Sequence, residues 1–130
     1  RAPHFVGGGV VFGPSANKNY TKKMNKKERR LALKSALTYK AGDKAVIVVE
    51  KFDAETNKTK DMIKVLETLK ATDKTLIVVT ELTDNLILST RNLNNVKLVL
   101  ANEVNTYDVL CCEKLIITQD AVKYIEEVLK

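Results

Sequence analysis

Four short aliphatic runs recur along the last ninety residues of the chain, each separated from the next by a segment with helical periodicity. The runs are KAVIVVE at 44–50, TLIVVT at 75–80, VKLVLA at 96–101 and KLIIT at 114–118. Short apolar runs of this kind are typical of strands in a parallel sheet, because both faces of such a sheet are covered. We therefore expect four strands and predict that the first, 44–50, is buried on both faces.

The segments between and after these runs carry apolar residues at helical spacing. The expected helices are 58–71, 84–93, 106–111 and a last helix that contains Ala121, Val122, Ile125, Val128 and Leu129. Thr59 and Thr118 are predicted N-caps, and Asp84 is expected to open the short helix that begins there. Alternation of strand and helix predicts an α/β fold: a mainly parallel sheet of about four strands, with right-handed crossovers and helices on both faces.

Residues 1–20 follow no persistent helical or strand period. Its glycines and prolines predict extended or turning backbone; they are Pro3, the Gly7–Gly9 run, Gly13 and Pro14. It has little core of its own, so we expect it to be ordered by whatever it lies against. We predict an extended basic arm at 1–20 and an α/β domain at 21–130.

The segment from about Met24 to Lys40 is rich in helix formers, and Gly42 with Asp43 is its expected stop. One stripe of this predicted helix is basic, formed by Lys23, Lys26, Lys27, Arg30 and Lys34. The opposite side is expected to carry Met24, Leu31, Ala32 and Tyr39. Leu33 and Leu37 lie near the edge of the basic stripe, which predicts that the second half of the helix is the more deeply buried half.

Charge is strongly segregated along the chain. Residues 1–40 hold ten Lys or Arg against a single acid, Glu28, which is a net charge of +9. Residues 41–130 hold twelve bases and fifteen acids, which is −3. A basic front on a mildly acidic body favours a polyanionic partner such as a nucleic acid, over the alternative of a merely solubilising lysine-rich face.

The stretch FVGGGVVFGPS at 5–15 has the G-x-x-x-x-G spacing of a phosphate-binding loop between Gly8 and Gly13. Such a loop follows a buried strand, opens a helix and uses a lysine to reach the phosphates. Here no strand precedes the glycines, and Pro14 stands in place of the lysine. A nucleotide site is therefore disfavoured, whereas Phe5 and Phe12 are suited to stacking on unpaired bases.

The residues offer little support for catalysis or metal binding. Carboxylates follow the predicted strands at Glu50, Glu81, Glu103 and Asp120, where they are more simply explained as solvated groups or helix caps. The only histidine, His4, is far in sequence from the adjacent Cys111 and Cys112, and no C-x-x-C exists, so we expect no metal, no cofactor and no catalytic triad. The free thiols suit a reducing compartment, and the apolar runs are too short to span a bilayer.

These residues, taken in order, are similar to a known family. The run RAPHFVGGGVVFGPSANKNYTKKMNKKERRLALKSAL resembles the middle of bacterial large-subunit ribosomal protein four. The later blocks IVVEKF, KTKDMIKVL, LIVVTEL, DNLILSTRNL, NTYDVL and KLIITQDAVKYIEEVL resemble later segments of the same family. The family carries a further N-terminal stretch with the outgoing strand and tip of a long loop. The resemblance therefore implies that this chain is a fragment, with residues 1–20 as the returning strand.

The resemblance implies a structural constituent of the large ribosomal subunit, not an enzyme. This constituent is cytoplasmic in the ribosome, binds 23S rRNA, supports assembly and reaches the peptide exit tunnel through the loop tip. The implied partners are large-subunit rRNA and neighbouring large-subunit proteins, and no membrane is implied. Binding to its own messenger RNA stays open. The alternative is an α/β enzyme or ligand-binding domain acting on nucleic acid or nucleotide. The predicted RNA-contacting residues are Arg1, His4, Phe5, Gly7, Gly8, Gly9, Phe12, Lys18, Lys22, Lys23, Lys26, Lys27, Arg29, Arg30 and Lys34.

Overall fold

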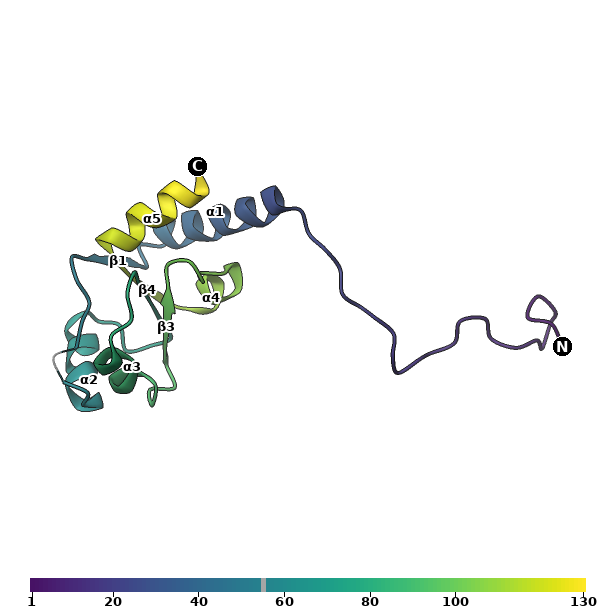
Figure 1. Cartoon of the computed structure of the whole chain (residues 1–130), viewed down its shortest axis with the longest axis horizontal. Coiled ribbons are helices and arrows are strands. Elements are labelled where there is room, and N and C mark those ends of the chain that lie inside the picture. Colours follow the sequence, from purple (N-terminus) through teal and green to yellow (C-terminus); the bar gives the residue numbers. More distant parts are fainter. Residues whose placement is uncertain (55) are drawn as a thin grey trace.

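The computed structural model describes residues 1–54 and 56–130 and shows a four-stranded, wholly parallel sheet with helices on both faces (Figure 1). The elements, in chain order, are α1 (Lys26–Gly42), β1 (Val46–Val49), α2 (Thr59–Thr68), β2 (Thr75–Val79), α3 (Asp84–Thr90), β3 (Val96–Leu100), α4 (Thr106–Cys111), β4 (Lys114–Thr118) and α5 (Gln119–Leu129). The predicted α/β class and strand number are confirmed. No helix in the described ranges is long and apolar enough to cross a membrane.

The strand order is β1-β4-β2-β3, so the last strand in sequence lies inside the sheet. β4 pairs with β1 through Val46 opposite Leu115 and with β2 through Leu76 opposite Leu115. β3 pairs with the other side of β2, which leaves β1 and β3 as the two edges. The prediction that the first strand is buried on both faces is therefore wrong, because Val48 on this edge strand is 54% exposed. β2 is the strand that is buried throughout.

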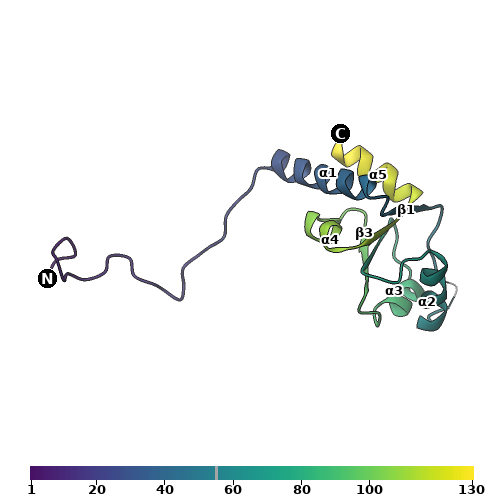
Figure 2. The ribbon, with the colours of Figure 1, turned by 180° about the vertical axis from the view of Figure 1, so that it is seen from behind.

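Alternate residues of the central strands enter two separate cores, as the period of a strand requires. On one face Leu76, Leu115 and Ile117 pack against Ala36 of α1 and Ile125 of α5, with α4 completing this layer. On the other face the central-strand residues Ile77, Val79 and Ile116 pack against α2 and α3, through Met62, Leu66 and Leu86. Figures 1 and 2 show α1 beside α5 on one side of the sheet and α2 beside α3 on the other.

The predicted helix starts and stops are close to the observed ones, but the cap chemistry differs. Thr59 is the first residue of α2, and the N-cap is Lys58, so the prediction of Thr59 as N-cap is wrong. Thr118 does occupy the N-cap position of α5, yet its side chain makes no capping hydrogen bond. α1 ends at Gly42 with Asp43 as its C-cap, as expected from the sequence.

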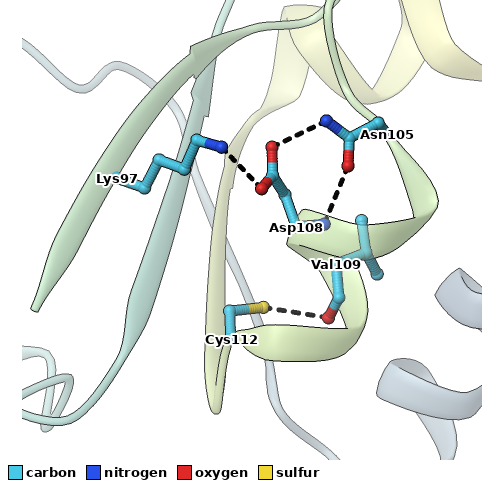
Figure 3. Close-up of polar contacts among 5 residues, drawn as sticks. All are labelled: Lys97, Asn105, Asp108, Val109 and Cys112. Carbon is cyan, nitrogen blue, oxygen red and sulfur yellow. Dashed lines mark hydrogen bonds and ion pairs between the residues drawn. The ribbon is translucent and has the colours of Figure 1, made fainter. Parts of the chain in front are cut away.

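Asn105 and Asp108 hold the short helix α4 in place (Figure 3). The Asn105 side chain accepts a hydrogen bond from the Asp108 backbone N–H at 2.8 Å and donates one to the Asp108 carboxylate at 2.9 Å. Lys97 of β3 pairs with the same carboxylate at 2.5 Å, and the Cys112 thiol donates to the Val109 carbonyl at 3.1 Å. These contacts hold α4 in place, and α1 packs against it.

Candidate nucleic-acid interface

The basic front of the chain divides into a free part and an anchored part within α1. Residues 26–32 are exposed on all sides, and α1 first meets the domain at Leu33, Ala36 and Leu37. The prediction that the second half of this helix is the more deeply buried half is confirmed. In Figure 1 the first turns of α1 extend past the edge of the sheet toward the arm.

The face of α1 that packs on the sheet and its other helices differs in part from the apolar face that the sequence predicted. Leu31 and Tyr39, expected to lie opposite the basic stripe, are both exposed and contact no core cluster. The packed face is instead Leu33, Ala36, Leu37 and Lys40, which follow the spacing of one helix side. This face is about a quarter turn from the lysine stripe, so packing leaves the lysines facing solvent.

Lys40 is a structural exception among the ten bases of the front. Its side chain is buried, and its Nζ donates a hydrogen bond to the carbonyl oxygen of Cys112, at the C-cap of α4, at 2.5 Å. The bond links α1 to the end of α4 across 72 positions of sequence. A signal was present in the sequence, because Lys40 lies three residues after Leu37 on the same helix face.

The other predicted contacts of α1 are free to meet a ligand. Lys26, Lys27, Arg29, Arg30 and Lys34 are all exposed. Within the described ranges, none of them forms an ion pair. The nearby acid, Glu28, accepts a hydrogen bond from Asn25 at 3.4 Å. The lysines and arginines of the stripe and its flank therefore present positive charge that the protein itself does not neutralise, with Lys34 closest to the domain.

Lys23 does not belong to the helical stripe. α1 begins at Lys26, so Lys22, Lys23 and Met24 lie in the segment that leads into it, and this part of the stripe prediction is wrong. The physical reason is that Asn25 adopts extended backbone angles and stops the helix there. Lys22 and Lys23 are still exposed and stand directly ahead of the stripe.

The arm, residues 1–20, runs away from the domain without helix or strand (Figures 1 and 2). All its predicted contact residues are exposed except Gly8, which is half-buried in a turn at the chain start. There the Phe5 N–H donates to the Ala2 carbonyl at 3.0 Å, and the Gly8 N–H donates to the Phe5 carbonyl at 2.8 Å. A Cβ on Gly8 would lie 2.2 Å from the Ala2 oxygen, so this turn requires glycine.

Aromatic groups along the arm are open to solvent. The rings of His4 and Phe5 lie 4.4 Å apart between centroids, and Phe12 is 98% exposed at a positive φ of 51°. Lys18 places its ammonium 5.5 Å from the centre of the ring of Tyr20, a residue absent from the predicted contacts. The signal for Tyr20 was its spacing, since residues two apart in an extended chain share a side. Aromatic rings can stack on bases, and the cations between them can contact phosphates.

The sequence that forms this α/β domain and its basic, aromatic-bearing arm matches a defined family of proteins. The sequence profile of the ribosomal protein L4/L1 family matches residues 1–128, and the chain belongs to this family. The family expected from the motifs is thereby confirmed.

The chain is also similar to curated relatives that share one name. The large ribosomal subunit protein uL4 of Phytoplasma australiense is 48% identical over 130 residues, which is 100% of this chain and 62% of the relative. The proteins of the same name from Onion yellows phytoplasma (strain OY-M) and Magnetococcus marinus are each 46% identical, over 130 and 127 residues. They are covered to 62% and 61% of their lengths, so the chain spans about three fifths of these relatives.

Proposed function

We propose that the chain is the rRNA-binding part of a structural constituent of the large ribosomal subunit. Residues 1–20 would be an RNA-contacting arm and residues 21–130 the domain that supports it. The observation that carries the proposal is the set of cations on the free half of α1 and the segment ahead of it, which no carboxylate of the described chain neutralises. Membership of a ribosomal protein family supports 23S rRNA as the polyanion.

Helix α1 and the arm would contribute to RNA binding through different interactions. Phosphate contacts release counterions and give affinity without sequence preference, which is the role suited to Lys26, Lys27 and Lys34. Arg30 carries a planar fork that grips a phosphate with two hydrogen bonds. Stacking of the arm's exposed rings on unpaired bases would then order the arm on RNA. A role in subunit assembly and, through a loop tip outside this chain, at the peptide exit tunnel belongs to the same proposal.

The test is a salt series of binding to fragments of large-subunit rRNA. Replacing Lys26, Lys27 and Lys34 together by Gln should flatten the slope of log K against log salt by about two to three units, because each lost phosphate contact removes somewhat under one unit. The matched control is K58Q/K60Q/K64Q on and beside α2, which makes the same charge change on the domain. We expect this control to change the slope by well under one unit.

Two outcomes would count against the proposal. An equal flattening in both triple variants would mean that total charge alone drives binding. An unchanged slope in K26Q/K27Q/K34Q, with melting temperature retained, would mean that the lysines of α1 do not contact phosphate. A rise in melting temperature on adding nucleotide, without binding to rRNA, would favour the alternative of a ligand-binding or catalytic α/β domain.

A further inference from the structure

A pocket of about 320 Å³ lies beyond the carboxyl ends of β1, β4 and β2. The crossovers explain its position. β4 leads into α5 on one face of the sheet, whereas its neighbours β1 and β2 lead into α2 and α3 on the other. Connections that leave adjacent strands in opposite directions open a crevice, and this is where open α/β sheets commonly bind ligands.

The rim of this strand-end pocket is acidic. Among the described residues that line it, four are carboxylates and one, Lys51, is a cation; the carboxylates are Glu50, Asp53, Glu81 and Asp120. The structure thus groups three of the four strand-end acids that the sequence offered and leaves out Glu103. The interpretation of these acids as solvated groups or helix caps did not include their shared position, since Glu50, Glu81 and Asp120 line one cavity.

Two of these carboxylates already have partners in the chain. Asp53 accepts hydrogen bonds at 2.8 Å from the Thr83 hydroxyl and from the Ala54 N–H, which lower the pKa of its carboxyl and keep it ionised. Asp120 pairs with Lys123 at 3.3 Å, on the exposed first turn of α5. Glu50 and Glu81, by contrast, form no ion pair within 1–54 and 56–130. Their charge is available to a ligand.

Thr118 gives an independent indication of a ligand. The residue lines the same pocket, is only 7% exposed, and its hydroxyl has no hydrogen-bond partner in the described chain. Strand alternation places its side chain on the α2 and α3 face with Ile116, away from the N–H groups that open α5. Buried hydroxyls are normally paired, and a donor entering the pocket would satisfy this one.

We propose that the strand-end pocket receives an arginine side chain from a basic protein partner in the subunit, an inference that rests on the proposed function. A guanidinium has five donors in a plane and reaches acceptors on separate strands, here Glu50, Glu81 and Thr118. Its weak hydration suits a pocket that is also lined by Phe52 and Val79. RNA is repelled by this acidic rim. In the described ranges, no three His, Cys, Asp or Glu side chains are placed so that they could hold one metal ion.

The experiment is an amide-shift NMR titration of the 130-residue chain with the peptide acetyl-Gly-Arg-Gly-amide. We expect saturable shifts centred on the amides of Thr80 and Thr118, and weaker ones with acetyl-Gly-Lys-Gly-amide. The double variant E50Q/E81Q should weaken arginine-peptide binding about tenfold or more, because two charge-assisted contacts are lost. The variant T118V removes the hydroxyl at constant shape and should weaken binding by a smaller factor.

The matched control is E103Q/E113Q, which makes the same charge change at exposed positions outside the pocket. Equal weakening by the control pair would overturn the proposal in favour of general charge attraction. Separate titrations with spermidine and with Mg²⁺ test free cations, and tighter binding of either at the same amides would also overturn it. Binding of E50Q/E81Q to rRNA should be unchanged, so failure of the pocket and failure of rRNA binding are distinguishable, and melting curves verify that each variant folds.

Discussion

Phe12 in the arm and Ile77 in β2 are large apolar side chains of one chain, yet Phe12 is 98% exposed and Ile77 is fully buried. The same contrast holds for charge, because the front of the chain carries +9 and the rest −3. In the domain an apolar side chain stabilises the free protein by leaving water. In the arm it contributes nothing to that stability. We therefore propose that the arm contributes in a complex, and for this reason we assign the proposed RNA-binding role to the exposed part of the chain.

The largest expected difference between the two regions is in resistance to protease. The arm and the first turns of α1 make no core contacts, so their opening costs close to nothing, whereas cleavage in the sheet requires global unfolding. Trypsin should cut after Lys18, Lys22 and Lys23 orders of magnitude faster than after Lys97 of β3 or Lys114 of β4, and an rRNA fragment should slow the early cuts. Arm cleavage as slow as domain cleavage in free protein would mean that the arm has internal contacts.

A pair of alanine variants compares core and arm directly. Ile77→Ala should lower the free energy of unfolding by about 2–5 kcal/mol, because it leaves a cavity in the centre of the sheet. Phe12→Ala removes a larger side chain and should change it by less than about 0.5 kcal/mol. Urea denaturation measures both. A destabilised Phe12→Ala variant would show that the arm packs on the domain.

Two lysines of α1 allow the same comparison, between an anchored and an exposed side chain, within one helix. Lys40→Met should cost about 1–3 kcal/mol of unfolding free energy, because it leaves the Cys112 carbonyl without its donor. Lys34→Met, at an exposed position, should stay within about 0.5 kcal/mol but weaken rRNA binding. Denaturation and rRNA binding measured on the same two variants should give opposite rankings. Similar stability for both variants would remove Lys40 as an anchor of α1.

The sequence predicted the local elements well because their signals are local. The run at 114–118 coincides with β4 as observed, and the expected helical segments contain α2 and α3. The order of strands in the sheet is set by tertiary packing, which no local period encodes. That order explains why the strand predicted at 44–50 as buried on both faces is an edge strand. It also explains why Glu103, which follows the other edge strand β3, does not line the strand-end pocket.

The candidate interface was predictable in composition and less so in geometry. Ten bases within 1–40 are evident from the sequence, but the roles of Lys23 and Lys40 depend on where α1 begins and on the groups that its last turn meets. The buried lysine differs from its neighbours only through a carbonyl that is 72 positions away in sequence. Long-range contacts of this kind are fixed by the fold as a whole.

The interior position of β4 has a kinetic consequence during synthesis. β1 pairs only with β4, so residues 46–49 have no partner strand until residues 114–118 have been made. The sheet therefore closes late, around its most sequence-distant contacts, which is a slow type of folding step. Domain folding must wait for β4, whereas the arm has no fold to complete before it meets the RNA that we propose it binds. Under the proposed function, a nascent chain would meet its RNA partner before it has a core.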